Sequence, residues 1–201
     1  MRIVHRLAGI LCLGFLATAP LGAQTHEWTN IQPVDSGGNG PQIRRIIRDL
    51  RYPVLGSSDS IRVDSFIQGS HLTLLWYFAA WCWNCNQEIP LLQKMFSQYH
   101  SKGFNILGIG VYSPEKDLEA FRDAHDITFP VVVGPSRLKD PETRQQTYHY
   151  TLRKLAGDQR TWGTPLNLWI TNGERGAPAM YIAAGEIHPE ELQHFLEAHL
   201  P

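Results

Sequence analysis

The sequence has few cysteines and no marked excess of charge of either sign. Its 201 residues include three cysteines, and 18 lysines and arginines nearly balance 19 aspartates and glutamates. No basic run reaches the density of a nucleic-acid-binding surface, so nucleic acid is excluded as an expected partner. So few cysteines also exclude the dense disulfide framework of small secreted domains. The length instead suits one domain with a sizeable apolar core and a modest extension.

Residues 1–23 differ from the rest of the chain. Arg2 and Arg6 precede an apolar run over residues 7–20, and small residues follow up to Ala23. This three-part pattern predicts a secretory signal peptide over residues 1–23 and therefore export to the periplasm. The run is shorter than the roughly 20 residues that cross a bilayer. An uncleaved inner-membrane anchor that faces the periplasm is the alternative, whereas Leu11 before Cys12 does not fit a lipoprotein signal.

Cleavage of this signal would remove Cys12 and leave Cys82 and Cys85 as the cysteines of the exported chain. A disulfide that closes so short a loop constrains the unfolded chain little, so a purely stabilising role is not expected. An isolated pair at this spacing indicates a redox or a metal-binding role.

The polar and apolar patterns divide the remaining chain in two. Residues 24–42 are rich in glycine and polar turn formers and predict a flexible leader, and residues 43–201 form the predicted folded domain. Residues 61–67 are a weak strand candidate. The unbroken apolar run at residues 73–79 predicts a central strand that is covered on both faces. Apolar positions then recur every three or four residues from Cys85 to Tyr99 and predict a helix that ends near Gly103.

Further strands and helices alternate towards the C-terminus. Strands are predicted at residues 105–111, 128–133, 166–171 and 179–184, the last two joined by a hairpin turn at Asn172-Gly173. Helix starts are predicted at residues 113–115, 140–142 and 189–191. This order predicts an α/β fold with a mixed central sheet flanked by helices.

The cysteine pair lies where the predicted central strand meets the predicted helix. Two cysteines three residues apart at a helix start lie on the same side, close enough for a disulfide. The positive end of the helix favours thiolate over thiol. Cys82 is therefore predicted as the attacking thiolate, and Cys85 as the thiol that resolves the mixed disulfide.

Several motifs match one known family. They are Trp81-Cys82-Trp83-Asn84-Cys85, then Glu88 and Pro90, then Gly163-Thr164-Pro165, with supporting segments at residues 104–111 and 126–131. Over about residues 61–200 the chain resembles the TlpA-type (ResA/DsbE-like) periplasmic thiol-disulfide oxidoreductases of the thioredoxin superfamily. The resemblance implies a thioredoxin-like fold and protein disulfide reductase activity.

The resemblance also implies roles for individual residues. Pro165 would follow a cis peptide bond and bring the Thr164 backbone against the disulfide, where it pairs with an extended substrate chain. Trp81, Trp83 and Asn84 would complete the substrate-binding surface with Thr164 and Pro165. The alternative for Pro165 is a plain turn proline before a strand.

Glu88 matches an acidic position of the family beyond the second cysteine. One helical turn places it near Cys85, where a partly buried carboxylate accepts or returns a proton. A solvated helix carboxylate is the alternative.

Three features depart from the family pattern. Trp76 stands where thioredoxins carry a buried aspartate, so Glu88 has to serve as proton acceptor. Trp83-Asn84 lacks a histidine that stabilises the thiolate, which favours a reductant or isomerase over an oxidant. Residues 135–162 are longer than usual, and for them we expect a helix with a core stripe and a solvated basic face; partner recognition is the alternative. That stretch carries a group of aromatic and basic residues: Tyr148, His149, Tyr150, Arg153, Lys154 and Trp162.

These patterns predict an exported enzyme that exchanges its Cys82–Cys85 dithiol with protein thiols and disulfides in the periplasm, as a reductant re-reduced by a membrane electron donor. The family's clients are often apocytochromes, which implies cytochrome c maturation. No cofactor besides the redox-active disulfide and no metal is expected, because no histidine is paired with another at zinc-ligand spacing or lies beside the motif. The alternatives are a peroxiredoxin-like thiol peroxidase with antioxidant activity, and a non-catalytic module that binds a metal or a partner.

Overall fold

The computed structural model describes residues 28–34, 38–136, 140–172 and 178–201. Their centre is a six-stranded sheet in the order β2-β9-β8-β5-β6-β7. Strands β5, β6 and β7 run parallel, and β8 and β9 run antiparallel to their neighbours. The strands of this sheet are β2 (Gln32–Pro33), β5 (Leu72–Phe78), β6 (Phe104–Gly110), β7 (Val131–Val133), β8 (Leu166–Thr171) and β9 (Met180–Ala183). The predicted thioredoxin-like fold with a mixed central sheet flanked by helices is confirmed.

Two small strand pairs lie outside the central sheet. β1 (Trp28–Thr29) pairs in parallel with β10 (Glu186–Ile187), and β3 (Arg51–Pro53) forms a hairpin with β4 (Ser60–Arg62). The segment predicted as a flexible leader therefore contains two strands, because β2 also pairs with β9. That prediction was wrong for residues 28–34: it rested on the glycine-rich composition of residues 35–41, whereas the backbone of residues 28–34 bonds to the folded domain.

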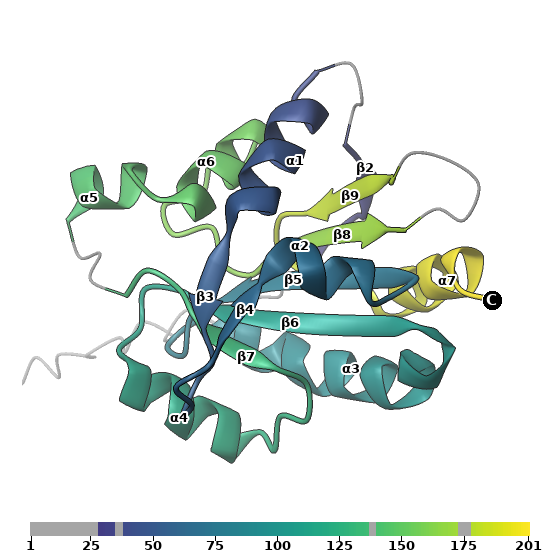
Figure 1. The fold of residues 1–201 in the computed structure, drawn as a ribbon, viewed down its shortest axis with the longest axis horizontal. Coiled ribbons are helices and arrows are strands. Elements are labelled where there is room, and N and C mark those ends of the chain that lie inside the picture. The colour runs from purple at the N-terminus through teal and green to yellow at the C-terminus, as the bar shows by residue number, and fades with distance from the viewer. Residues whose placement is uncertain (1–27, 35–37, 137–139, 173–177) are drawn as a thin grey trace, which may run out of the picture.

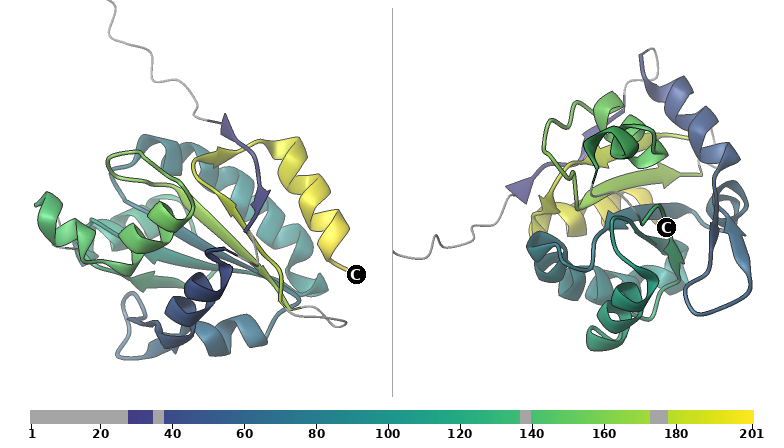
Figure 2. Two further views of the ribbon diagram at one scale, coloured as in Figure 1. Left: turned by 90° about the horizontal axis from the view of Figure 1, so that it is seen from above. Right: turned by 90° about the vertical axis from the view of Figure 1, so that its left-hand side faces the viewer.

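Helices cover both faces of the sheet (Figures 1 and 2). The long α3 and the C-terminal α7 lie together on one face, and α1 and α2 lie on the other, with α6 beside α1. The helices are α1 (Gly40–Asp49), α2 (Val63–Gln68), α3 (Trp83–Tyr99), the short 3-10 helix η1 (His100–Lys102), α4 (Glu115–Ala124), α5 (Pro141–Gln145), α6 (Tyr148–Leu155) and α7 (Pro189–His199). None of the helices in the described ranges is long and apolar enough to cross a membrane.

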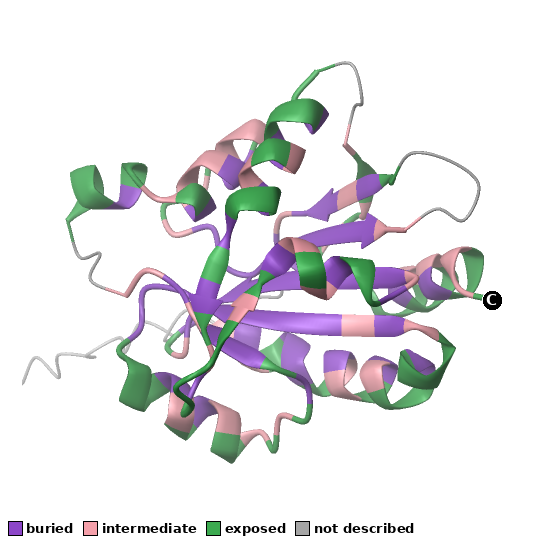
Figure 3. Cartoon of the chain, viewed as in Figure 1, coloured by how far each residue is buried: buried purple, intermediate pink, exposed green. Residues whose placement is uncertain are grey.

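The core follows the apolar runs of the sequence. Every residue of β5 is buried, as the predicted central strand requires, and most of β6 is buried as well (Figure 3). Two aromatic side chains of β5, Trp76 and Phe78, stack with ring centroids 4.3 Å apart on the face that α3 covers. The strand is thus held on both sides where it leads into the cysteine pair.

Several local predictions changed. Residues 61–67 form the end of β4 and most of α2, because Val63 and Ile67 bury one helical face, a spacing too short to detect in a seven-residue window. The single helix expected after residue 140 is two helices, because the Thr147 side chain accepts from the Tyr150 backbone N–H and starts a new one. Helix α1 was not predicted as a helix. The predicted signal peptide, Cys12 and Gly173 of the predicted hairpin turn lie outside the described residues.

Candidate active site

The two cysteines lie at the N-terminus of α3, just after the C-terminal end of β5. Cys82 is the N-cap residue, and its sulfur accepts the backbone N–H of Cys85 at 3.3 Å. Cys82 is 6% exposed and Cys85 is fully buried, and both are free thiols in this structure. The helix start therefore directs a backbone donor at the more accessible sulfur.

The surroundings act in opposite directions on the two thiols. The pKa of Cys82 is lowered from 9.0 to about 7, mainly because the Cys85 thiol donates a hydrogen bond to the Cys82 sulfur. The Thr164 side chain, the Cys85 backbone N–H and the charge of Arg160 lower it further, whereas burial raises it. Burial, followed by the interaction with Cys82, raises the pKa of Cys85 well above 9.0. Cys82 is thus partly thiolate at neutral pH, and Cys85 stays protonated.

The loop before β8 faces Cys82 from the other side. The peptide bond between Thr164 and Pro165 is cis, as the family resemblance implied. The Cys82 Sγ donates to the Thr164 carbonyl oxygen at 3.5 Å. A backbone carbonyl of the loop therefore lies against the reactive sulfur, in the place expected for a segment that pairs with an extended chain.

Glu88 lies one turn into α3 beyond Cys85 and is buried, with 2% of its surface exposed. Its Oε2 accepts the indole N–H of Trp76 at 2.8 Å, and its Oε1 accepts from the Asn167 amide at 3.0 Å and from the Ile187 backbone N–H at 3.2 Å. Trp76 and Asn167 are cross-strand partners on β5 and β8, so the sheet itself places both donors. The alternative of a solvated helix carboxylate is wrong for Glu88.

Burial is the main cause that raises the pKa of Glu88, from 4.5 to about 8, and the three donors oppose it. The charge of Glu88 in turn is among the causes that raise the pKa of Cys85. The pKa of the Glu88 carboxyl group thus lies between the pKa values of Cys82 and Cys85. This places a proton-exchanging group next to the buried cysteine at near-neutral pH.

The remaining motif residues surround Cys82 at the surface. Trp81 is 51% exposed, and its indole N–H donates to the Tyr112 carbonyl oxygen at 3.0 Å. Its ring meets that of Trp162 edge-on, with centroids 5.1 Å apart. Trp83 and Asn84 are half-buried in the first turn of α3. The structure therefore gathers all the predicted site residues around one pair of sulfurs.

Two charged residues of the site were not predicted from the sequence. Arg160 donates to the carbonyl oxygens of Thr164 at 3.3 Å and Pro165 at 2.8 Å. Asp158, which is 5% exposed, accepts from Arg160 at 3.0 Å and from Arg153 at 3.4 Å. The sequence offers little to find them by: Asp158 stands between Arg153 and Arg160, in a segment without helical or strand periodicity.

The predicted solvated basic face on residues 135–162 needs a correction. Arg153 is fully buried and His149 is 1% exposed. Burial is the main cause that lowers the pKa of His149 to about 3, so its ring is neutral. Its Nε2 donates to the Gly163 carbonyl oxygen at 3.2 Å, which leaves Nδ1 to accept the Tyr112 hydroxyl at 2.7 Å. These polar side chains point under the loop that carries Pro165, because its buried carbonyl groups need donors.

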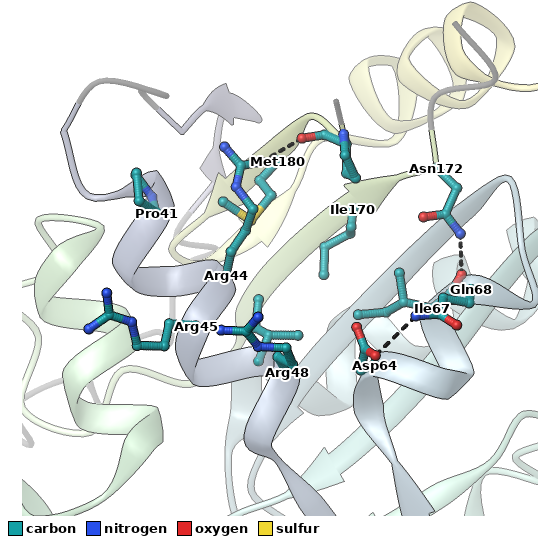
Figure 4. Close-up of a pocket in the computed structure, with 12 residues that line it drawn as sticks. Pro41, Arg44, Arg45, Arg48, Asp64, Ile67, Gln68, Ile170, Asn172 and Met180 are labelled. Atoms are coloured by element: carbon teal, nitrogen blue, oxygen red, sulfur yellow. Dashed lines mark hydrogen bonds between the residues drawn. The ribbon is translucent and has the colours of Figure 1, made fainter. Parts of the chain in front are cut away.

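Other polar groupings lie away from the cysteines. Within the ranges that the structure describes, no group of three or more His, Cys, Asp or Glu side chains is placed to hold a metal ion. A cavity of about 500 Å³ lies between α1, α2 and the ends of β8 and β9 (Figure 4). Arginines of α1 and apolar side chains of the sheet line this cavity, and none of the predicted site residues does.

Comparisons with known proteins agree with this geometry. The model of the AhpC/TSA family matches residues 48–140. The thiol-disulfide oxidoreductase ResA of Oceanobacillus iheyensis is 34% identical over 130 residues, which cover 65% of this chain and 64% of that protein. The chain thus spans slightly less than two thirds of the length of this relative.

Solved structures show the same fold. A DsbF homologue from Corynebacterium diphtheriae superposes with a TM-score of 0.55 at 15% identity, covering 90% of this chain and 96% of that one. A secreted Mycobacterium tuberculosis disulfide oxidoreductase homologous to E. coli DsbE gives a TM-score of 0.53 at 13% identity, covering 77% and 98%. The chain is therefore similar to the thioredoxin-like AhpC/TSA family over residues 48–140 and to the ResA thiol-disulfide oxidoreductases.

Proposed function

We propose that the protein is a thiol-disulfide oxidoreductase that works outside the cytoplasm and reduces disulfides of other exported proteins. One observation carries this proposal: the Cys82 sulfur lies at a helix N-terminus and 3.5 Å from the Thr164 carbonyl oxygen, with Cys85 buried behind it. One thiol is placed for attack and the other for release. The ResA relative, named as a thiol-disulfide oxidoreductase, supports the same reaction.

The reaction transfers two electrons in two displacements. The Cys82 thiolate attacks one sulfur of the client disulfide, the client S–S bond breaks, and the departing sulfur leaves as a thiolate that takes up a proton. Cys85 then loses its proton and attacks the Cys82 Sγ. The mixed disulfide breaks, the second client thiolate leaves, and a Cys82–Cys85 disulfide remains. A dithiol donor, in our proposal a membrane protein, returns two electrons and two protons to this disulfide.

Glu88 accepts the proton that Cys85 loses in the second displacement. Cys85 has a pKa well above its ordinary value, so it needs a nearby base when it attacks. The ionised Glu88 carboxylate accepts this proton, and the protonated carboxyl group returns it when the pair is re-reduced. With a pKa of about 8, Glu88 is present in both forms near neutral pH.

The loop that carries Thr164 and Pro165 supplies the client-binding edge. Thr164 has its carbonyl next to Cys82, so a client chain that extends along this loop brings its disulfide to the Cys82 sulfur. Trp81, which is half-exposed, extends the surface beyond the sulfur. Trp83 and Asn84 complete it on the helix side.

The pKa of Cys82 favours reduction over oxidation. A value of about 7 matches reducing thioredoxins, whereas strong oxidants hold their thiolate near 3.5. We therefore propose a reductant in the periplasm, with apocytochromes among its clients. A reduction potential well below the glutathione poise of the compartment would support this direction, and a potential above it would make the protein an oxidant.

The peroxidase alternative fits the site less well. It needs Cys85 as the peroxide-reactive thiolate, but Cys85 is fully buried and burial raises its pKa. A metal-binding module would be recognised by stoichiometric copper or zinc binding without disulfide reductase turnover.

Trapping of clients tests the proposed reaction. Cys85→Ser removes the resolving thiol and keeps a hydroxyl donor towards the Cys82 sulfur. We expect this variant to accumulate mixed disulfides between Cys82 and exported proteins, seen as thiol-sensitive bands on non-reducing gels and identified by mass spectrometry. The matched Cys82→Ser variant should trap none. A Cys85→Ser variant that stays free of mixed disulfides while its Cys82 thiol remains reactive would refute the proposal.

A further inference from the structure

Arg160 shares a hydrogen-bond acceptor with the attacking cysteine. Its guanidinium donates to the Thr164 carbonyl oxygen at 3.3 Å, and the Cys82 Sγ donates to the same oxygen at 3.5 Å. A second guanidinium nitrogen donates to the Pro165 carbonyl oxygen at 2.8 Å. Arg160 thus holds two successive carbonyl groups of the loop that faces the sulfur.

Arg160 is held by an ion pair with Asp158, whose side chain is buried. Both Asp158 oxygens accept from its guanidinium, Oδ1 at 3.1 Å and Oδ2 at 3.0 Å, and the Arg160 side chain is 25% exposed. Such a two-point contact fixes a guanidinium plane more firmly than a single bond.

The next layer of the network holds Asp158 in turn. The fully buried Arg153 donates to the Asp158 carboxylate at 3.4 Å and to the Thr161 carbonyl oxygen at 3.1 Å. Gly163 lies directly against Arg153: a Cβ atom at this position would lie 2.2 Å from the Arg153 Nε. Helix α6, the loop after it and the cis-proline segment are therefore one packed unit.

The shared acceptor matters when Cys82 loses its proton. In the thiol form, the S–H group donates to the Thr164 carbonyl; in the thiolate form, two electron-rich atoms face each other. A positively charged donor on the same carbonyl offsets this repulsion and keeps the loop in place. We propose that Arg160 is a positioning residue that holds the Thr164 carbonyl against Cys82 in both protonation states and stabilises the Cys82 thiolate. This inference rests on the proposed function, since it assigns Arg160 a part in the attack by Cys82.

Several groups act on the titration of Cys82, and Arg160 is one of them. The Cys85 thiol and backbone N–H on α3, and the Thr164 side chain and Arg160 on the loop, all lower the pKa of Cys82, and burial opposes them. A change at Arg160 therefore shifts the titration without abolishing it.

Alkylation of Cys82 as a function of pH tests the inference. The variants are Arg160→Gln, which removes the charge, Arg160→Lys, which keeps it, and Arg48→Gln, which removes an exposed charge on α1. We expect Arg160→Gln to move the alkylation midpoint to higher pH and to slow alkylation at pH 7 by about two- to five-fold, because less thiolate is present. Arg160→Lys should recover most of the rate, and Arg48→Gln should match the unchanged protein.

The equilibrium with glutathione provides a second measurement. Loss of thiolate stabilisation weakens the reduced form, so Arg160→Gln should shift the equilibrium towards the Cys82–Cys85 disulfide by about two-fold at pH 7. Circular dichroism and denaturant unfolding establish that the variants are folded when they are compared.

Two outcomes would overturn the inference. One is an alkylation midpoint in folded Arg160→Gln equal to that of the unchanged protein; the other is an Arg160→Lys variant that behaves like Arg160→Gln. Both measurements report on Cys82 whether or not a client is reduced. A failure to trap clients with Cys85→Ser would therefore refute the proposed function separately.

Discussion

Two buried charged clusters flank the cysteine pair, and they are built in opposite ways. In the carboxylate cluster, neutral donors from Trp76, Asn167 and the Ile187 backbone hold Glu88, and the charge of the buried Glu186 adds to the rise in its pKa. These donors all come from strands, whereas Glu88 itself lies on α3. The guanidinium cluster of Arg153, Asp158 and Arg160 is an ion network carried by α6 and an irregular loop.

The difference shows how one fold gives each of its two thiols a different electrostatic environment. The donors that hold Glu88 are neutral, so burial raises the pKa of its carboxyl group to about 8, close to neutral pH. Asp158 is buried too, but hydrogen bonds and charges from Arg160 and Arg153 outweigh the burial and hold its pKa below the ordinary value. In our proposal, the first cluster moves a proton beside Cys85, and the second keeps a constant charge beside Cys82.

The largest expected effect comes from removing the anion of the guanidinium cluster. Asp158→Ala leaves Arg153 buried without a counter-charge and releases Arg160 from its anchor. We expect the free energy of unfolding to fall by about 3–5 kcal/mol, measured by urea denaturation. Asp123→Ala, which breaks an exposed pair with Arg122, should change it by less than about 0.5 kcal/mol. Equal losses in the two variants would contradict the structural role of the buried network.

A change in the carboxylate cluster should appear as a pH effect instead. The folded protein binds the Glu88 proton more tightly than the unfolded chain, with pKa values of about 8 and 4.5. The resulting stability is complete below pH 4.5 and is lost as the pH rises to about 8. Between pH 5 and pH 8 the unchanged protein should lose on the order of 3 kcal/mol more than Glu88→Gln. Parallel pH profiles of unfolding in the two proteins would show that Glu88 is ionised throughout.

The smallest expected effect is the difference in stability between Gly163→Ala and Gly157→Ala, which separates overpacking against Arg153 from backbone strain. Gly163 and Gly157 both have a positive φ, of 67° and 78°, but only Gly163 lies against Arg153; a Cβ at Gly157 meets nothing within 4 Å. Gly157→Ala should cost about 1–2 kcal/mol through backbone strain. Gly163→Ala should cost about 1–3 kcal/mol more, through overpacking against Arg153, and similar denaturation midpoints would exclude this contact.

The two clusters also differ in how well the sequence predicts them. Glu88 follows Cys85 by three residues on a predicted helix, so helical geometry places it near the sulfur. Its donors are harder to find: Trp76 was recognised as the residue in place of an aspartate, but not as a donor to Glu88. That contact needs the β5–β8 pairing, which brings Asn167 opposite Trp76.

Arg160 and Asp158 could not be predicted at all. Both lie in a loop, where neither the helical nor the strand period constrains which way a side chain points. Arg153 looked like part of a solvated basic face because buried arginines are rare without a partner. Its partner, Asp158, accepts from it only after the chain turns at Gly157. Regular elements were thus predictable, and the irregular connection that adjusts the site was not.

The pairing of β1 with β10 has a consequence for the order in which the chain folds. Trp28 and Thr29 lie beside Glu186 and Ile187, so this contact joins segments separated by almost the whole described chain. Ile187, whose N–H bonds to Glu88, belongs to that pair. Contacts of such long sequence separation form slowly, because a large loop must close first. A chain still emerging from a ribosome lacks this last strand, so the donors around the buried Glu88 carboxylate are complete only after residue 187 has emerged.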